Sequence, residues 1–181
     1  TQDTPWDGLE VDIQPFIDLT PKERGARFAA FVRSGCKVII GQPNILRIDR
    51  REKFNPIEFL GGGWTIEEED ERSLKLTEVD LTKICFETCL KKGETSINGK
   101  EKLERLKSAG HIRLDAGIFL TLWKNQQLIP DKWKMKTNGY TTYIHFDGTV
   151  LRYPHGYHYV LFLYWDDGRW YWRYFWLSRG L

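Results

Sequence analysis

The chain has 181 residues, of which 41% are hydrophobic and 29% are charged, and its formal net charge is +2. This size and composition are ordinary for one globular domain that needs no disulfide or metal staple, so we expect a single domain over residues 1–181. No apolar run approaches the roughly 18 residues of a membrane span, and the first residues lack the charged-then-apolar pattern of a signal peptide. A cytoplasmic protein with no membrane association is therefore expected.

The small net charge hides an uneven distribution along the chain. Residues 1–90 contain twelve Lys and Arg against seventeen Asp and Glu, whereas residues 91–181 contain fifteen against eight. A basic second half is compatible with a polyanionic partner, and it is equally compatible with attraction between the two halves. The acidic run Glu67-Glu68-Glu69-Asp70-Glu71 predicts a solvated loop or strand edge, because five like charges resist burial.

Helix and turn signals organise the first third of the chain. Thr20-Pro21-Lys22-Glu23 is a capping box with proline at the first helical position, and it predicts a helix that runs to about Ser34. Strand-like segments at 36–40 and 45–49 flank a turn sequence and predict a hairpin. Asn55-Pro56 begins a short helix that stops at three glycines. The first helix is expected to bury Phe28, Phe31 and Val32 and to stop at Gly35.

The middle of the chain predicts short strands and then two helices. The segments 64–68, 73–79 and 83–89 show strand-like alternation. Asn98-Gly99-Lys100-Glu101 resembles a capping box and begins a helix that ends at Gly110. The apolar residues of this helix are Leu103 and Leu106.

Asp115 caps the second of these helices, and Pro130 marks its end. Its inward-facing residues are expected to be Ile118, Leu122 and Trp123. Helix, glycine turn, helix and hairpins is also the order of a winged helix, in which this helix would read DNA. Its side chains from Asp115 to Leu122 are apolar or neutral apart from the capping aspartate. This composition argues against base-reading contacts.

Aromatic residues are concentrated near the C-terminus, where 15 of the chain's 26 lie between Tyr140 and Trp176. Strand-like runs at 140–146, 149–152, 157–165 and 169–177 alternate with turn residues. They predict a four-stranded antiparallel meander that could curl into a barrel. The expected turns are a type I′ turn at Asp147-Gly148, a longer turn at Pro154-His155-Gly156, and a type I turn closed by a glycine bulge at Asp166-Asp167-Gly168.

The period of two divides the last strand into an apolar face and an arginine-bearing face. With a bulged turn, Trp170, Trp172 and Tyr174 would oppose Tyr164, Phe162 and Val160, and Trp176 would continue the same face. We predict that this face is core, because leaving four large rings in water forfeits several kcal/mol at about 25 cal/mol per Å². The arginine-bearing face is predicted to meet solvent or a partner.

Basic and aromatic residues in the second half favour non-specific nucleic-acid binding, since cations neutralise phosphates and rings stack on bases. The partner would be nucleic acid or, failing that, another protein, and the oligomeric state is not indicated. The simpler interpretation is that the lysines form the solvated face of a helix and that the aromatic residues are core. The candidate ligand-binding residues are Arg152, Arg169, Tyr171, Arg173, Lys100 and Lys107.

Two other ligand classes use residues of the same region. A carbohydrate platform would use the Trp and Tyr rings with Asp166, Asp167 and His155 as polar neighbours. A hydrolase or nuclease would use His145 or His158 with a nearby acid, although the sequence contains no Gly-x-Ser-x-Gly or His-Glu-x-x-His motif.

Cysteine usage favours a reducing compartment, because Cys36, Cys85 and Cys89 form no secreted framework. Cys85 and Cys89 lack two further ligands at metal spacing, so we expect ordinary buried thiols, no metal site and no cofactor. A protein-binding scaffold is the remaining alternative, and it predicts an exposed apolar patch above a few hundred Å².

Four segments carry a resemblance that covers most of the chain. They are residues 74–83 (LKLTEVDLTK), 99–107 (GKEKLERLK), 111–116 (HIRLDA) and 146–152 (FDGTVLR). Together they resemble a family of small hypothetical proteins from uncultivated bacteria with small genomes, and the likeness runs from about Arg27 to Leu177. That family has no assigned activity, cofactor or catalytic residue, so the resemblance implies a self-contained bacterial domain and transfers no site residues.

The sequence therefore predicts an α+β fold with an N-terminal helix and short strands, a central helix pair and a C-terminal antiparallel, aromatic-rich β-meander. Its expected function is that of a small non-enzymatic binding or interaction protein, with nucleic acid as the first ligand to test.

Overall fold

The structure is a computed structural model that describes residues 19–33, 44–137 and 139–180. The chain divides into two units, Thr1–Gln42 and Pro43–Leu181, and each is described by itself. The expectation of a single domain over residues 1–181 stays a prediction. Within the described ranges, no helix combines the length and the apolar character that crossing a membrane requires.

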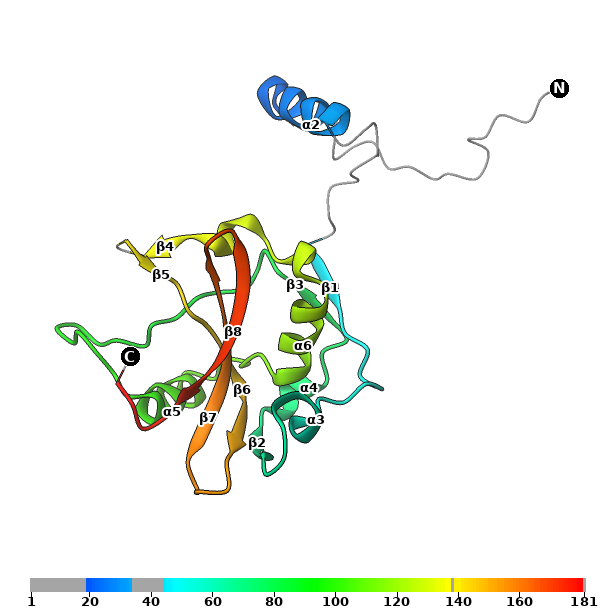
Figure 1. Ribbon diagram of the computed structural model, residues 1–181. Coiled ribbons are helices and arrows are strands. Elements are labelled where there is room, and N and C mark those ends of the chain that lie inside the picture. The colour runs from blue at the N-terminus through cyan, green and yellow to red at the C-terminus, as the bar shows by residue number, and fades with distance from the viewer. Residues whose placement is uncertain (1–18, 34–43, 138, 181) are drawn as a thin grey trace. The chain divides into compact units, whose positions relative to one another are not determined.

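The described part of the first unit is helix α2 (Pro21–Arg33) (Figure 1). Its predicted capping box is confirmed, because the backbone N–H of Thr20 donates to Glu23 Oε2 at 2.9 Å and the N–H of Glu23 donates to Thr20 Oγ1 at 3.3 Å. The predicted burial of its apolar face is wrong for Phe28 and Val32, which are 64% and 52% exposed. A helix buries an apolar stripe only against another element, and α2 is the only element described in this unit.

Some expectations for this region lie outside the described residues. They are the strand at 36–40, the turn that follows it, Gly35, Cys36 and the side chain of Phe31.

The second unit is built on a four-stranded antiparallel sheet in the order β2-β6-β7-β8 (Figure 1). These strands are β2 (Thr65–Glu69), β6 (Ile144–Arg152), β7 (His158–Asp166) and β8 (Arg169–Trp176). The predicted α+β class and C-terminal antiparallel meander are confirmed. The fourth strand is β2 rather than a separate strand at 149–152, and the sheet stays open, with β2 and β8 at its edges, instead of closing into a barrel.

Two small sheets and several short helices complete this unit. The small sheets pair β1 (Ile45–Arg47) with β3 (Glu78–Asp80) and β4 (Lys136–Thr137) with β5 (Tyr140–Thr141). The helices are α3 (Pro56–Leu60), α4 (Glu71–Leu74), α5 (Gly99–Ser108), α6 (Ala116–Lys124) and the 3-10 turns η1 (Gln126–Leu128) and η2 (Asp131–Lys134).

Helix caps were predicted well. The side chains of Asn55, Asn98 and Asp115 each accept backbone N–H groups at the start of α3, α5 and α6. The predicted strand at 73–79 is wrong over its first residues, which belong to α4, and residues 83–89 form no strand. Alternation is a weak signal here, because Asp70 caps a helical turn that competes with an extended chain.

Helices cover both faces of the sheet (Figure 1). On the face that we call the α6 face, Ile118, Phe119 and Leu122 pack with Phe146, Leu161, Leu163 and Trp170. On the opposite face, the α5 face, Leu103 packs with Val150, Val160 and Leu177. Of the helix residues predicted to face inward, Leu103, Leu106, Ile118 and Leu122 are buried as expected, and Trp123 is partly buried against the core.

The turn between β7 and β8 sets a different register from the predicted one. Asp166 pairs with Arg169, so the loop holds only Asp167 and Gly168, whose φ angles of 44° and 76° are both positive. This is a two-residue hairpin loop and not a bulged type I turn. Trp170, Trp172 and Tyr174 therefore oppose Trp165, Leu163 and Leu161 instead of Tyr164, Phe162 and Val160.

Asp147-Gly148 is not a hairpin turn, since both residues lie inside the continuous strand β6. The register of β6 against β7 shifts between Phe146 and Leu151, which identifies an extended bulge. The N–H of Gly148 donates to Leu114 O at 2.8 Å, and its carbonyl accepts from the N–H of Asp70 at 2.8 Å. Contacts with distant segments thus replace the local turn.

The predicted core face of β8 is only half buried. Trp170 is 4% exposed and Trp172 packs against the core, but Tyr174 and Trp176 are 48% and 38% exposed. A nine-residue helix such as α6 is about 14 Å long, whereas an eight-residue strand extends about 26 Å. The helix therefore cannot cover the whole face.

Two smaller expectations are also corrected. The acidic run does form a sheet edge, but its member Asp70 is 5% exposed and accepts hydrogen bonds from Arg72 and Arg113. Burial raises the pKa of Asp70, yet these hydrogen bonds hold it at about 2. Cys85 is exposed and Cys89 only partly buried, so the expectation of buried thiols is wrong for Cys85.

Candidate functional site

Six side chains form two rows across the α5 face of the sheet, near the β7–β8 turn. In the first row Tyr143, which directly precedes β6, lies beside the paired residues Tyr164 and Tyr171. In the second row His145 pairs with Phe162, and Phe162 pairs with Arg173. We call these six residues the aromatic platform.

The rings of the platform contact one another continuously. Tyr164 and Tyr171 stack with their centroids 5.3 Å apart and their planes at 17°. Tyr143 packs edge-on against Phe162 and Tyr164 at 5.1 and 5.6 Å. Tyr143 is 56% exposed, because α5 covers the α5 face only around Val160 and Leu177, toward the other end of the strands. A row of rings with one wet side can accept a planar ligand by stacking.

Two arginines of β8 accompany these rings. The Arg169 guanidinium lies 4.6 Å from the centroid of the Tyr171 ring, and its Nε donates to the Tyr171 hydroxyl. Arg173 is exposed beside Phe162. Among the described residues no carboxylate forms an ion pair with Arg169 or Arg173. The Arg173 charge therefore remains available to an anionic ligand, whereas Arg169 has Asp166 as its cross-strand neighbour and already donates to the Tyr171 hydroxyl.

His145 is the uncharged β6 end of the second row. Its ring stacks on Phe162 with centroids 5.4 Å apart and also contacts Phe175 at 5.1 Å. Burial, with the nearby Lys102 charge, lowers the pKa of His145 to about 3. Its Nδ1 atom is buried and has no hydrogen-bond partner among the described residues.

Replacing His145 by phenylalanine should make the protein less sensitive to mild acid. With a folded pKa near 3 and an unfolded pKa near 6.5, only the unfolded chain gains a proton at this residue between pH 7 and pH 5. The stability that neutral His145 contributes is present above pH 6.5 and falls with pH, by about 2 kcal/mol at pH 5. Urea unfolding of both proteins at the two pH values measures the difference, and equal pH dependence would contradict a depressed pKa.

Two of the other three predicted site residues line a groove at the far end of the same face, and the third, Arg152, pairs with the groove residue His158. This groove, of about 320 Å³, is lined by both predicted lysines, Lys100 and Lys107, and by His158. Lys107 Nζ lies 2.8 Å from Glu68 and 3.0 Å from Glu104, and Arg152 lies 3.5 Å from Glu67. Two of the three predicted cations here, Lys107 and Arg152, are thus already paired with carboxylates.

The structure therefore brings together three of the six predicted residues, namely Arg169, Tyr171 and Arg173. Arg152 pairs with His158, and Arg169 pairs with Asp166. His158 and Asp166 are eight residues apart along β7, so the two arginines lie at levels of the sheet about 26 Å apart. One phosphate contact cannot join the two regions, and the platform is the better candidate because Arg173 and the neighbouring Arg169 form no ion pair with a carboxylate of the described residues.

The sequence did not indicate Tyr143, Phe162 or Tyr164 as site residues, and it named His145 only for the hydrolase or nuclease alternative. Phe162 and Tyr164 were assigned to the core because the β7–β8 turn was taken to be bulged, and a one-residue shift moves every side chain of a strand to the other face. The signal was present in Asp167-Gly168, which alone satisfies a two-residue turn.

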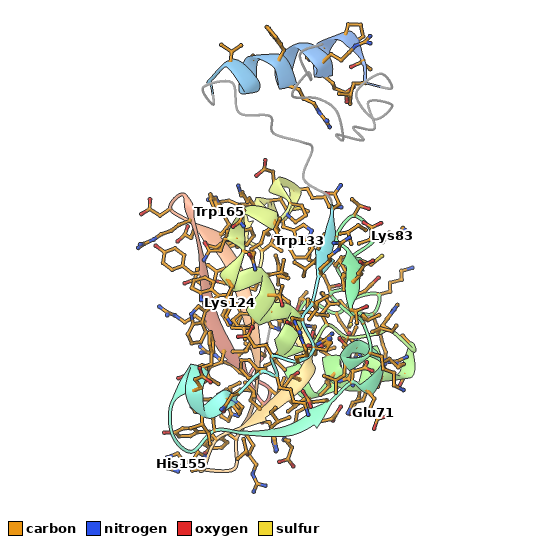
Figure 2. All side chains as sticks on the ribbon, turned by 90° about the vertical axis from the view of Figure 1, so that its right-hand side faces the viewer. Glu71, Lys83, Lys124, Trp133, His155 and Trp165 are labelled. Atoms are coloured by element: carbon orange, nitrogen blue, oxygen red, sulfur yellow. The ribbon has the colours of Figure 1, made fainter. Side chains whose placement is uncertain are left out.

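The residues predicted for the carbohydrate and enzyme alternatives lie apart. Asp166 and Asp167 lie at the β7–β8 turn, next to Trp165, while His155 lies in the β6–β7 turn. Figure 2 shows Trp165 and His155 at opposite ends of the sheet. His158 lies 3.8 Å from Glu67, whereas His145 lies on β6 at one end of the second row of the platform. Among the described residues, no three His, Cys, Asp or Glu side chains form a group that could hold a metal ion.

Comparisons of the chain with protein-family models, with curated proteins and with solved structures found no match. The resemblance to the family of small bacterial proteins therefore stays a prediction, and only the site bears on the function.

Proposed function

We propose that this protein is a non-enzymatic module that binds single-stranded nucleic acid on the aromatic platform. The observation that carries the proposal is the row Tyr143, Tyr164 and Tyr171, flanked by Arg169 and Arg173 without acidic partners among the described residues. Stacking of one base on an aromatic side chain contributes about 1–3 kcal/mol, and arginine neutralises the backbone phosphates.

The shape of the platform favours a single strand with little sequence preference. In a duplex the base faces are stacked on one another, so an exposed sheet can reach them only when the strand is unpaired. The two rows are two residues apart along the strands, which is about 7 Å, and this spacing suits two or three neighbouring bases. Rings stack on every base, so the ligand is expected to be mixed in sequence.

Removing one platform ring should weaken the binding of a short single strand. We expect Tyr143→Ala to reduce the affinity for a labelled 12-nucleotide DNA or RNA of mixed sequence about 5- to 150-fold, as the loss of one stacked base implies. Fluorescence anisotropy at two salt concentrations measures this effect. Arg173→Ala should lower the dependence of log K on log salt by about 0.7, the contribution of one phosphate of a single strand.

Matched controls lie away from the platform. Tyr157 is 49% exposed and packs on Trp176 of the α6 face, so Tyr157→Ala should leave affinity unchanged. Arg51, in an exposed pair with Asp49, is the control for the loss of a positive charge. Absence of binding, binding that is indifferent to salt, or equal losses in Tyr143→Ala and Tyr157→Ala would each remove the proposal.

A further inference from the structure

The outer edge of β8 presents backbone groups with no strand to pair with. Asp166 and Arg169 close the two-residue turn, and the N–H of Leu177 donates to His158 O at 2.9 Å. In an antiparallel ladder the odd-numbered residues of β8 therefore bond to β7, and the even-numbered residues point their N–H and C=O groups outward. Among the described strands β8 pairs with β7 alone, so Trp170, Trp172 and Tyr174 have open backbone groups.

The two edges of the sheet differ in how they are protected. The β2 edge carries Glu67, Glu68 and Glu69, and a bulge interrupts its register between Ile66 and Glu68. Charges and bulges are the devices by which proteins block pairing at an edge. β8 has eight residues without proline, glycine or bulge, and its register with β7 is uninterrupted. β2 thus has both devices, whereas β8 has only the charges of Arg169 and Arg173.

We propose that β8 pairs with β8 of a second copy of this chain, antiparallel and centred on Trp172. The backbone groups that point outward belong to the even-numbered residues, and each must pair with an even-numbered residue of the second copy. The possible alignments therefore differ in their central residue, which can move along β8 in steps of one. Centred on Trp172, the pairing places Trp170 against Tyr174 of the second copy and leaves β7 undisturbed.

Charge selects this alignment from its neighbours. Pairing centred on Trp172 places Arg173 opposite Tyr171 of the second copy and Arg169 opposite Phe175, so each guanidinium meets a ring. An alignment centred on Tyr171 places Arg169 opposite Arg173, and one centred on Arg173 places that arginine opposite itself. Like charges directly opposite each other destabilise a strand pair. The second copy is therefore a better occupant of this edge than an arbitrary basic strand.

The pairing would join the two sheets into one of eight strands, with both aromatic platforms on the same side. This follows because directly opposed residues of an antiparallel pair project from the same face. The inference stands on the backbone and charge pattern of β8, and it holds whether or not the platform binds nucleic acid.

The mass of the full chain in solution tests the pairing. We expect light scattering after size exclusion to give twice 21.4 kDa at micromolar concentration. Tyr174→Pro removes an outward N–H without touching the β7 ladder, because proline is tolerated at such edge positions, and it should give a monomer. Tyr174→Ala removes the same side chain but keeps the N–H, so it should remain a dimer. A monomer for the unmodified chain at all concentrations overturns the proposal.

Disulfide trapping tests the alignment and does not depend on the proline variant folding. Chains with Tyr171→Cys mixed with chains with Arg173→Cys should form a crosslinked pair under mild oxidation, because opposed non-hydrogen-bonded residues lie about 4.5 Å apart at Cα. Mass spectrometry identifies the linked peptides, and the unmodified chain controls for the native cysteines. Crosslinking through residue 171 or 173 in either variant alone, or no crosslink in the mixture, overturns the proposed alignment.

Discussion

Replacing Gly148 by alanine is expected to lower the free energy of unfolding by about 3 kcal/mol or more. A Cβ at this position would lie 2.6 and 2.7 Å from the carbonyl carbon and oxygen of Leu114, and closer still to the carbonyl oxygen of Arg113. These are backbone atoms, so no side-chain rotation relieves the clash. Urea unfolding followed by tryptophan fluorescence measures the loss.

Gly62→Ala is the matched control for this prediction. Gly62 does not have a positive φ, and a Cβ there would meet no atom within 4 Å. The substitution should therefore change the free energy of unfolding by less than about 0.5 kcal/mol. If Gly148→Ala were as mild as Gly62→Ala, the close approach of β6 to the segment before α6 would be disproved.

The two Asp-Gly pairs of this chain show where local sequence stops being informative. Asp167-Gly168 forms the tight turn that such a pair favours, whereas Asp147-Gly148 lies inside a strand and contacts residues far away in the sequence. A turn signal states only that the backbone can reverse. Whether it does so depends on the packing of segments that the local pattern does not contain.

Features set by neighbouring residues were predictable from the sequence. The caps at Thr20, Asn55, Asn98 and Asp115 depend on side chains two or three residues from the N–H groups they accept, and all four are present. The exposure of Arg169 and Arg173 was predictable as well, because alternation along one strand does not depend on its partners.

Features set by partners were not predictable. Membership of the aromatic platform depends on the register between β7 and β8, and one residue of shift decided the faces of Phe162 and Tyr164. The exposure of Tyr174 and Trp176 depends on the length of α6, the helix that packs on their face of the sheet. No pattern within β8 encodes that length.

Buried ion pairs are a further class of contact that the sequence conceals. Lys102 Nζ lies 2.7 Å from Asp147, and Arg50 reaches Asp115 across 65 positions of sequence. The Lys102–Asp147 pair lies at the β6 bulge, and the Arg50–Asp115 pair lies at the start of α6. Both places are next to the segment that Gly148 contacts. The two pairs link α5 to β6 and the segment after β1 to the start of α6.

Replacing Asp115 by asparagine should lower the free energy of unfolding by about 3–5 kcal/mol, as expected when one member of a buried pair is lost. The Asp115 side chain is fully buried and accepts hydrogen bonds from Arg50, Ser73 and the backbone N–H groups of Gly117 and Ile118. Burial raises the pKa of Asp115, but hydrogen bonds from Arg50 and Ser73 hold it below its usual value. An amide cannot serve all these donors and leaves the Arg50 charge without its partner.

Asp49→Asn is the matched control, because Asp49 also pairs with an arginine, Arg51, but on the surface, where the two side chains are 51% and 92% exposed. Water replaces the lost contact there, so the expected change is below about 1 kcal/mol. The contribution of ionised Asp115 is present above the unfolded pKa near 3.9 and is lost as pH falls through the lower folded value. The difference between Asp115→Asn and the unmodified protein should therefore be full at pH 7 and shrink in strong acid. Equal effects of the two substitutions in urea unfolding at pH 7 would show that Asp115 does not hold the start of α6 against the body of the fold.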